Sequence, residues 1–595
     1  MEKSNQFLVT FSNLLKGDFE ALSDFENLKL DEIRLFFNGK LYWSTLNELL
    51  QNYIENGKKA FQTIDGDFLC IVVEPEKIMV VRDRHGAGSQ LFYSNEYISN
   101  SLLSFAGIDG FECKPNHEAL LTFMSIGYIP SPLTSLQGVS KLNAGFVLEY
   151  KNNQIKTSDL FDYNSFMQNV GTSKLTIEEA VIEYEKLHKS AIENRIKSAK
   201  KVGLLLSGGY DSGGNISALR DVYQGDVVSY SIGFKDNPWT ELPLSKILSE
   251  RYKSRHYDYE IDGSEIMQLP QILRATGDPF QEGGLLVNFT VMQLVKKSSE
   301  QPDIILGGDG NDQHFGTSGK ELAMHWKLKS KGVQFLQKWF DTLGDSISSF
   351  DKDSILFRTE FHNRKILHIQ QSDTFGFSLR KLNNMTLKGI NIKKLHYLQN
   401  APKSYKNFDD FFYNRNYNID IKQVINEVIL FKSSRMSELF GNKISFPYMS
   451  TDLYNFLNKM PVNYKFKGTL DELSGGKGVS KYLHKTYLKP KLPTEITDRK
   501  KQGGFAPLPI FLKDDTQRRA LFAYLRKADG VKAIFKIDKI ESLLNQYETI
   551  ATSKSYWFWY QQVKANQIIN LLTLAVWWEM YINKKTNLQN INELM

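Results

Sequence analysis

The chain has 595 residues, of which 41% are hydrophobic and 24% are charged, as in an ordinary globular protein. This length exceeds what one hydrophobic core usually supports, so we expect at least two domains. The formal net charge of +7 comes from lysines that are spread along the chain, which argues against a dedicated nucleic-acid binder. The charge is compatible with an anionic substrate.

The pattern of predicted secondary structure changes between residues 165 and 175. Before this point it reads as short strands and turns, and Gly66–Val73 with Lys77–Arg82 predict a hairpin around a Glu-Pro-Glu turn. After it, helical patterns alternate with apolar strands at Val202–Leu206, Val227–Phe234 and Asp303–Leu306. Such alternation predicts a parallel sheet flanked by helices.

The strand at Val202 runs directly into a glycine-rich turn. With no side chain at Gly208 and Gly209, backbone N–H groups can approach phosphate oxygens, and a following helix would direct its positive end at them. Ser207 and Ser212 can donate hydroxyl hydrogen bonds, and Asp211 can hold Mg²⁺. A plain strand-to-helix turn would explain the two glycines but not the serines and the carboxylate together. The loop is neither a Walker A loop nor a dinucleotide fingerprint.

The run Ser207–Ser212 resembles the Ser-Gly-Gly-x-Asp-Ser loop of the ATP pyrophosphatase (PP-loop) family. The resemblance implies ATP as cosubstrate, cleaved between its α- and β-phosphates to activate a substrate as the adenylate. One departure is Gly213, where many relatives carry another hydroxyl residue.

The first half resembles the glutamine amidotransferase domain of class B asparagine synthetases, an N-terminal-nucleophile (Ntn) αββα sandwich. The matching pieces are Asp65–Phe68, Arg82-Asp83 with Gly86, Leu91–Tyr93 and Gly127–Pro130. Such a glutaminase uses an N-terminal cysteine. Here position 2 is Glu2, and neither cysteine is near the start. We therefore expect residues 1–165 to be a degenerate amidotransferase-like domain that does not hydrolyse glutamine, and Cys70 and Cys113 to be structural.

The resemblance assigns residues 175–595 to the synthetase domain of the same superfamily, a Rossmann-like α/β fold with helical additions. It implies that the backbone around Leu206 and Ile232 faces adenine, at the carboxyl ends of neighbouring strands. Residues 320–430 match no motif, and we expect a helical region that shapes the acceptor site. Their aromatic residues, such as Phe411–Tyr413, suit either a peptide channel or a folded core.

A second apolar strand runs into an acidic loop at Ile304–Gly316. The loop resembles the family's Gly-Glu-Gly-x-Asp-Glu segment. This implies that Gly307 and Gly308 lie against the nucleotide and that Asp312 joins Asp211 on Mg²⁺, a cation that binds few protein ligands besides phosphates. The alternative is an exposed Asp-Gly turn.

Two residues are candidates for catalysis. Asp309 stands where asparagine synthetases place a glutamate, and its carboxylate could take a proton from an attacking amine. Lys501, in Arg499–Phe505, aligns with a lysine that stabilises charge on the adenylate and its pyrophosphate leaving group. The alternative for the lysine is a solvated basic turn. His314 is a further candidate for a general base, but a lone histidine beside a phenylalanine more often has a structural role or shapes the substrate site.

Two serines replace the aspartates of the family's acceptor segments. Ser434 stands at the aspartate of the family's Asp-Arg-Met segment, and Ser450 stands at the aspartate of its Pro-Phe-Leu-Asp segment. These changes put the family's usual contacts with the acceptor in doubt.

These motifs together imply that a carboxylate is adenylated by ATP and Mg²⁺ and then attacked by an amine. Superfamily members without the cysteine include the lasso-peptide macrocyclases, which we favour because Gly308–Phe315 looks like their acidic variants. A precursor peptide, a leader-binding protein and a leader peptidase would then be partners. A β-lactam or carbapenam synthetase, an ammonia-dependent asparagine synthetase-like enzyme and an inactive scaffold stay open; a tRNA-modifying enzyme is disfavoured.

No segment predicts export or membrane insertion. The first residues lack a secretory signal, and the two cysteines fit a reducing cytoplasm better than a disulfide scaffold. The apolar run Ile568–Ile582 is interrupted by Asn570 and Glu579 and is too short to span about 30 Å of hydrocarbon at about 1.5 Å per residue. We expect a buried helix, with contact of Trp577 and Trp578 with a membrane surface or a partner as the alternative.

Overall fold

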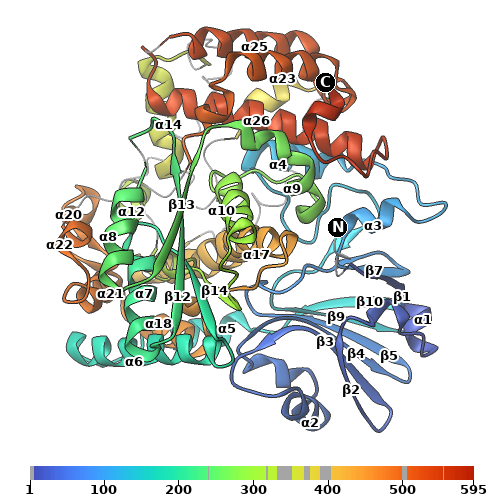
Figure 1. The fold of residues 1–595 in the computed structure, drawn as a ribbon, viewed down its shortest axis with the longest axis vertical. Coiled ribbons are helices and arrows are strands. Elements are labelled where there is room, and N and C mark those ends of the chain that lie inside the picture. The colour runs from blue at the N-terminus through green and yellow to red at the C-terminus, as the bar shows by residue number, and fades with distance from the viewer. Residues whose placement is uncertain are drawn as a thin grey trace.

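The structure is a computed structural model that describes residues 6–238, 240–316, 319–330, 351–367, 376–388, 404–498, 506–553 and 555–595. Figure 1 shows the N-terminal strands, in blue, on one side of the molecule, the parallel sheet, in green, beside them, and a layer of C-terminal helices, in red, above both.

The N-terminal part is a sandwich of two antiparallel sheets. The smaller sheet has the order β1 (Leu8–Thr10), β7 (Tyr97–Ser99), β6 (Phe92–Tyr93), β8 (Ser140–Lys141). The larger has the order β10 (Gln154–Asp159), β9 (Phe146–Lys151), β5 (Lys77–Arg82), β4 (Gly66–Glu74), β3 (Ile33–Leu41), β2 (Glu26–Leu30). The predicted hairpin is confirmed, because β4 pairs antiparallel with β5.

Alternation along β4 explains why both faces of the larger sheet are buried. Leu69 and Ile71 point into the core between the sheets, whereas Cys70 and Val72 point to the opposite face, which the helix α2 (Leu46–Asn56) covers. The buried position of Cys70 agrees with the expectation that this cysteine is structural.

The second part is built on a five-stranded parallel sheet, as the sequence predicts. Its order is β13 (Arg255–Ile261), β12 (Asp226–Phe234), β11 (Lys201–Leu205), β14 (Ile304–Leu306), β15 (Ile444–Ser445). Because β11 is central, the carboxyl ends of β12, β11 and β14 lie side by side, and ligands of open α/β sheets gather at such ends. The proposed limits of the two parts, 1–165 and 175–595, stay a prediction.

Two buried ion pairs join the sandwich to the parallel-sheet part. Arg195, in α6 (Ile177–Ile196), contacts Asp65 at 3.1 Å, and Lys141 contacts Asp278 at 2.8 Å. All four side chains are less than 10% exposed. Removing one member would leave a buried charge without compensation, so these pairs hold the two parts in one arrangement.

The described residues between 320 and 430 are mostly helical. They form α12 (Gly319–Ser330), α14 (Ile355–Leu367), α15 (Leu379–Met385), α16 (Phe408–Arg415) and the π-helix η7 (Asn416–Ile429). The aromatic run Phe411–Tyr413 is buried against Val462 and Phe466. The sequence left open whether these rings line a peptide channel or fill a folded core, and the structure shows them in a core.

The C-terminal apolar run lies within a buried helix, α26 (Phe558–Tyr581). Trp577 is fully buried and Trp578 is 9% exposed, so neither forms a surface for a membrane or a partner. Among the described residues, no helix is long and apolar enough to cross a bilayer.

Candidate active site

The glycine-rich turn after β11 is held by hydrogen bonds between its own serines. Ser212 Oγ donates to the carbonyl oxygen of Ser207 at 2.8 Å and accepts from the Ser207 backbone N–H at 3.1 Å, and the two hydroxyl oxygens lie 2.9 Å apart. The helix α7 (Tyr210–Val222) begins at this turn, with Gly209 as its N-cap. Unpaired N–H groups at such a helix start can bind phosphate.

The glycines at the start of α7 allow close packing. A Cβ at Gly213 would lie 3.1 Å from the side chain of Leu492, and one at Gly214 would lie 2.5 Å from the hydroxyl of Tyr448. The absence of a hydroxyl at Gly213 therefore has a local reason, because the helix approaches a neighbouring segment there.

The two carboxylates predicted to hold Mg²⁺ face one lysine. The ammonium of Lys481 lies 2.6 Å from Asp211 Oδ2 and 2.6 Å from Asp312 Oδ1, which brings the two loops together. Burial would lower the pKa of Lys481, but the charges of Asp211 and Asp312 outweigh this effect and raise it. Lys481 thus remains charged and offsets one of the two negative charges of the carboxylate pair.

Other polar groups fix the orientation of Asp211. Asn311 Nδ2 donates to Asp211 Oδ1 at 2.6 Å, and His484 Nε2 lies 3.2 Å from the same oxygen. Tyr448 donates its hydroxyl hydrogen to the backbone oxygen of Asp211 at 2.9 Å. Burial lowers the pKa of His484, although Asp211 opposes the shift, so this histidine is best described as a neutral support.

The residues expected around adenine and phosphate also converge. Leu206 donates its backbone N–H to Tyr230 O at 2.9 Å, which sets it beside the strand that carries Ile232. Gly307 is held by Asn215 Nδ2, which donates to its carbonyl oxygen at 2.9 Å. A Cβ at Gly308 would lie 3.2 Å from the backbone nitrogen of Ser212. Glycine therefore lets the β14 loop approach the start of α7.

Asp309 is partly buried and lies close enough to Asp211 for the two charges to interact. Ser433 Oγ donates to Asp309 Oδ2 at 2.7 Å, and the neighbouring Lys432 forms an ion pair with Glu282. Burial raises the pKa of Asp309, although the positive charge of Lys432 and the Ser433 hydrogen bond oppose the shift. A carboxylate whose pKa is raised toward neutrality is a better proton acceptor near pH 7.

Three further residues from the sequence motifs, His314, Ser434 and Ser450, do not take part in this cluster. His314 Nε2 lies 2.9 Å from the Tyr448 carbonyl oxygen, and burial lowers its pKa to about 3, which agrees with a structural role. Ser434 and Ser450 are buried, and their hydroxyls have no hydrogen-bond partner among the described residues. Lys501 lies outside the described residues.

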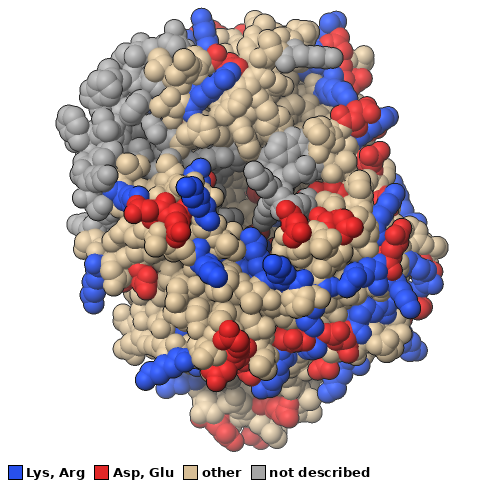
Figure 2. Space-filling view, turned by 90° about the vertical axis from the view of Figure 1, so that its left-hand side faces the viewer, with Lys and Arg blue, Asp and Glu red and all other residues tan. Residues whose placement is uncertain are grey.

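The donor set at Asp211 and Asp312 fits Mg²⁺. Two carboxylates from separate strand ends are hard oxygen ligands, and Mg²⁺ usually takes one or two of them together with phosphate oxygens and water. Across the described part of the chain, no cluster of three or more His, Cys, Asp or Glu could hold a metal ion by itself. Figure 2 shows a hollow in the face that carries α12, with Lys and Arg as well as Asp and Glu side chains around it.

The residue that sequence reasoning missed is Lys481. Sequence reasoning assigns this residue no role, because one lysine among many carries no signal. Its backbone φ of 54° is unusual for a residue with a side chain, and it stands at the start of α21 (Tyr482–Leu488). Only the fold shows that this conformation places its ammonium between two loops that are about 100 residues apart in sequence.

Comparisons with known proteins agree with the two-part architecture. The asparagine synthase family matches residues 183–579, and the glutamine amidotransferase domain matches residues 43–161. A putative glutamine-hydrolyzing asparagine synthetase of Mycobacterium bovis is 22% identical over 484 residues, covering 80% of this chain and 70% of the relative.

Two further relatives carry similar names. Asparagine synthetase (glutamine-hydrolyzing) 1 of Bacillus subtilis is 22% identical over 410 residues, which is 67% of this chain and 60% of the relative. Putative asparagine synthetase (glutamine-hydrolyzing) 2 of Methanocaldococcus jannaschii is 25% identical over 297 residues, which is 48% of this chain and 56% of the relative. With the family match spanning most of the chain, the protein belongs to the asparagine synthase family, whose chemistry is ATP-dependent amide ligation.

Proposed function

We propose that this ligase adenylates a carboxylate, releases pyrophosphate and then joins the acyl group to an amine. The carbonyl carbon gains a bond to the amine nitrogen, AMP leaves, and the amine gives up a proton. The observation that supports this most directly is the meeting of Asp211, Asp312 and Lys481 at the carboxyl ends of β11 and β14. Mg²⁺ bound there would neutralise charge on the phosphates.

Each part of the cluster has a task in this proposal. The N–H groups at the start of α7, with the hydroxyls of Ser207 and Ser212, bind phosphate oxygens. Lys481, which contacts Asp211, would offer its positive charge to the phosphates of a bound nucleotide. Asp309 is far from Asp211 in sequence but close enough for the two charges to interact, and it accepts the proton of the attacking amine.

The amine is proposed to come from the substrate rather than from glutamine. Cys70 lies inside β4, where burial raises the pKa of its thiol and disfavours the reactive thiolate. Burial also raises the pKa of Cys113. Within the family, this supports a cyclase that joins the α-amine of a lasso precursor peptide to an Asp or Glu side chain, with a leader-binding protein and a leader peptidase as partners.

The first experiment identifies the nucleotide products. The protein is incubated with ATP labelled at the α-phosphate, Mg²⁺ and a peptide that has a free α-amine and an internal glutamate. We expect AMP and pyrophosphate in equal amounts. Formation of ADP and phosphate would contradict adenylation, whatever the acceptor is.

The second experiment identifies the amide. Mass spectrometry of the peptide product should show loss of one water and resistance to aminopeptidase, as expected for an amine closed into a ring. A matched peptide with glutamine at the acceptor position should not react. Amidation by added ammonium, with no ring formed, would instead support the ammonia-dependent alternative, and ring closure of a small amino-acid derivative would support the β-lactam or carbapenam alternative.

A further inference from the structure

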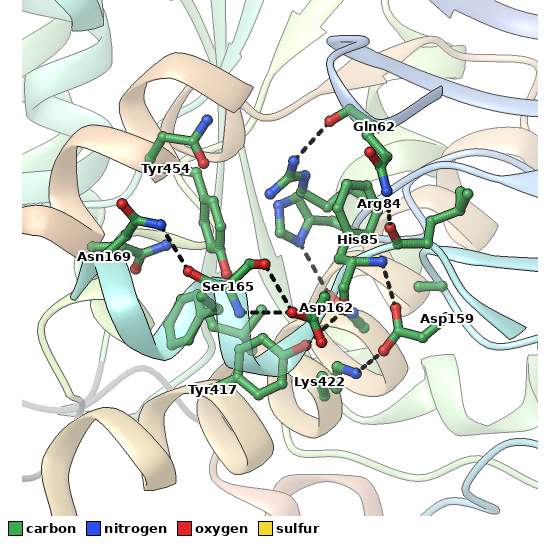
Figure 3. A pocket seen from close by; sticks show the side chains of 18 of the residues that line it. Gln62, Arg84, His85, Asp159, Asp162, Ser165, Asn169, Tyr417, Lys422 and Tyr454 are labelled. Atoms are coloured by element: carbon green, nitrogen blue, oxygen red, sulfur yellow. Dashed lines mark hydrogen bonds and ion pairs between the residues drawn. The ribbon is translucent and has the colours of Figure 1, made fainter. Parts of the chain in front are cut away.

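A separate cavity opens at the junction of the sandwich and the helices of the second part. Its volume is about 430 Å³, and none of the residues that line it belongs to the adenylation cluster. Figure 3 shows residues converging on it from the N-terminal strands, from α5 (Tyr163–Asn169) and from the helices η7 and α18 (Thr451–Lys459). Cavities of this size hold small organic ligands or a single amino-acid residue.

The inside of the cavity is lined by aromatic rings. Tyr417 and Phe166 lie with their ring centres 4.5 Å apart, and Tyr454 lies at 5.0 Å, edge to face, from the imidazole of His85. The guanidinium of Arg84 lies 3.9 Å from the centre of the Phe161 ring. A flat ring placed among these groups would make edge-to-face contacts and a cation–π contact.

The walls of the cavity are held in place by their own hydrogen bonds. Tyr417 donates its hydroxyl hydrogen to Phe161 O at 3.3 Å, and Arg84 Nη2 donates to Gln62 O at 3.0 Å. Lys422 forms an ion pair with Asp159 across the opening. A ligand would therefore enter a preformed site, and little ordering free energy would oppose its binding. The π-helix η7 supplies four of the lining residues, and π-helical turns frequently occur at functional sites.

The rim indicates which chemistry would accompany the ring. It carries uncharged hydrogen-bonding side chains that are exposed, namely Gln62, Ser165, Asn169 and Asn455. Amide and hydroxyl side chains both donate and accept, as a peptide main chain requires. The charged lining residues are Arg84, two lysines and two aspartates. Lys422 is paired with Asp159 and Arg84 donates to Gln62 O, so the cavity is not strongly positive, as a phosphate site would be. We propose that this cavity binds an aromatic amino-acid residue, with its ring inside and its main-chain groups at the rim.

The test measures binding of N-acetyl-L-phenylalaninamide to the full chain, without ATP, by saturation-transfer NMR and titration calorimetry. We expect a Kd of about 1 mM, typical of a ligand of this size. N-acetyl-L-alaninamide, which lacks the ring, should not bind. Free phenylalanine distinguishes the source, because tighter binding of the amide assigns the cavity to a residue within a peptide and tighter binding of the free amino acid assigns it to a metabolite. No binding of either aromatic probe would overturn the proposal.

Two variants on one helix provide the control. Ser165 and Gln168 are both exposed on α5, but only Ser165 lines the cavity. Ser165→Trp should weaken binding of the probe at least tenfold, and Gln168→Trp should leave it unchanged. Equal binding by both variants would refute the site.

A third variant guards against misfolding of Ser165→Trp. Phe166→Leu keeps apolar bulk and removes one ring, and it should weaken probe binding severalfold without changing adenylation. Because Asp211→Ala removes adenylation but not this cavity, probe binding by that variant separates failure of this proposal from failure of the ligase function.

Discussion

Asp83 and Asp211 each follow a strand, yet their carboxylates have different partners. The Asp83 carboxylate accepts hydrogen bonds from the backbone N–H groups of His85, Ala87 and Gly88, at 2.9 to 3.1 Å. The Asp211 carboxylate contacts the side chains of Lys481 and Asn311.

This difference separates a structural carboxylate from a functional one. The hydrogen bonds to Asp83 come from the backbone of its own loop and can break only if that loop changes shape. The partners of Asp211 are side chains, which can reorient when Mg²⁺ and a nucleotide bind. The same residue type after a strand is therefore a structural support in the sandwich, whereas in the parallel-sheet part it faces side chains from distant segments, as the proposed role of a Mg²⁺ ligand requires.

The largest expected effect tests this contrast directly. Asp211→Asn should lower pyrophosphate release at least about 100-fold, because the neutral amide binds a hard cation poorly. Asp83→Asn, the matched change in the sandwich, should keep most of the activity and lower the denaturant midpoint. Pyrophosphate release is measured with a coupled phosphate assay after pyrophosphatase treatment. Full activity in Asp211→Asn would remove the basis of the proposed mechanism.

The next effect concerns the junction between the two parts. Asp65→Ala should destabilise the protein by about 3 to 5 kcal/mol, because it leaves the buried Arg195 guanidinium without its partner. The double variant Asp65→Leu with Arg195→Met should recover much of this loss. Urea unfolding followed by fluorescence measures both. A double variant as unstable as the single one would show that the pair itself, and not an uncompensated charge, carries the stability.

A third effect is expected at Asp309. Asp309→Asn should slow amide formation about 100-fold and leave pyrophosphate release within a few-fold of the unchanged protein, since general-base catalysis contributes about this much. The two steps are separated by rapid quench. Equal slowing of both steps would place Asp309 in nucleotide binding instead.

The sequence motifs predict the sandwich, the parallel sheet and the two loops that carry Asp211 and Asp312, because each motif is a short run whose chemistry is local. Gly208 and Asp211, for example, indicate a phosphate-binding loop without any knowledge of the rest of the fold. Lys481 could not be found in this way, since its role depends on a backbone conformation and on the meeting of two distant loops. The aromatic cavity could not be predicted from the sequence for the same reason, because its Phe and Tyr rings come from three separate segments.

The smallest expected effect tests how the fold adjusts the pKa of Asp309. The Ser433 hydroxyl donates to Asp309 Oδ2 at 2.7 Å, and this hydrogen bond favours the charged carboxylate. Ser433→Ala should therefore raise the pKa of Asp309 further. Because only the deprotonated form accepts a proton, the acid limb of the rate of amide formation should move to higher pH, and the rate at neutral pH should fall a few-fold. Ser433→Thr should restore both. Ser434→Ala is the matched control, since that buried hydroxyl has no hydrogen-bond partner among the described residues, and its pH profile should coincide with that of the unchanged protein. A profile in Ser433→Ala that does not move would mean that the carboxylate which titrates in amide formation is not Asp309.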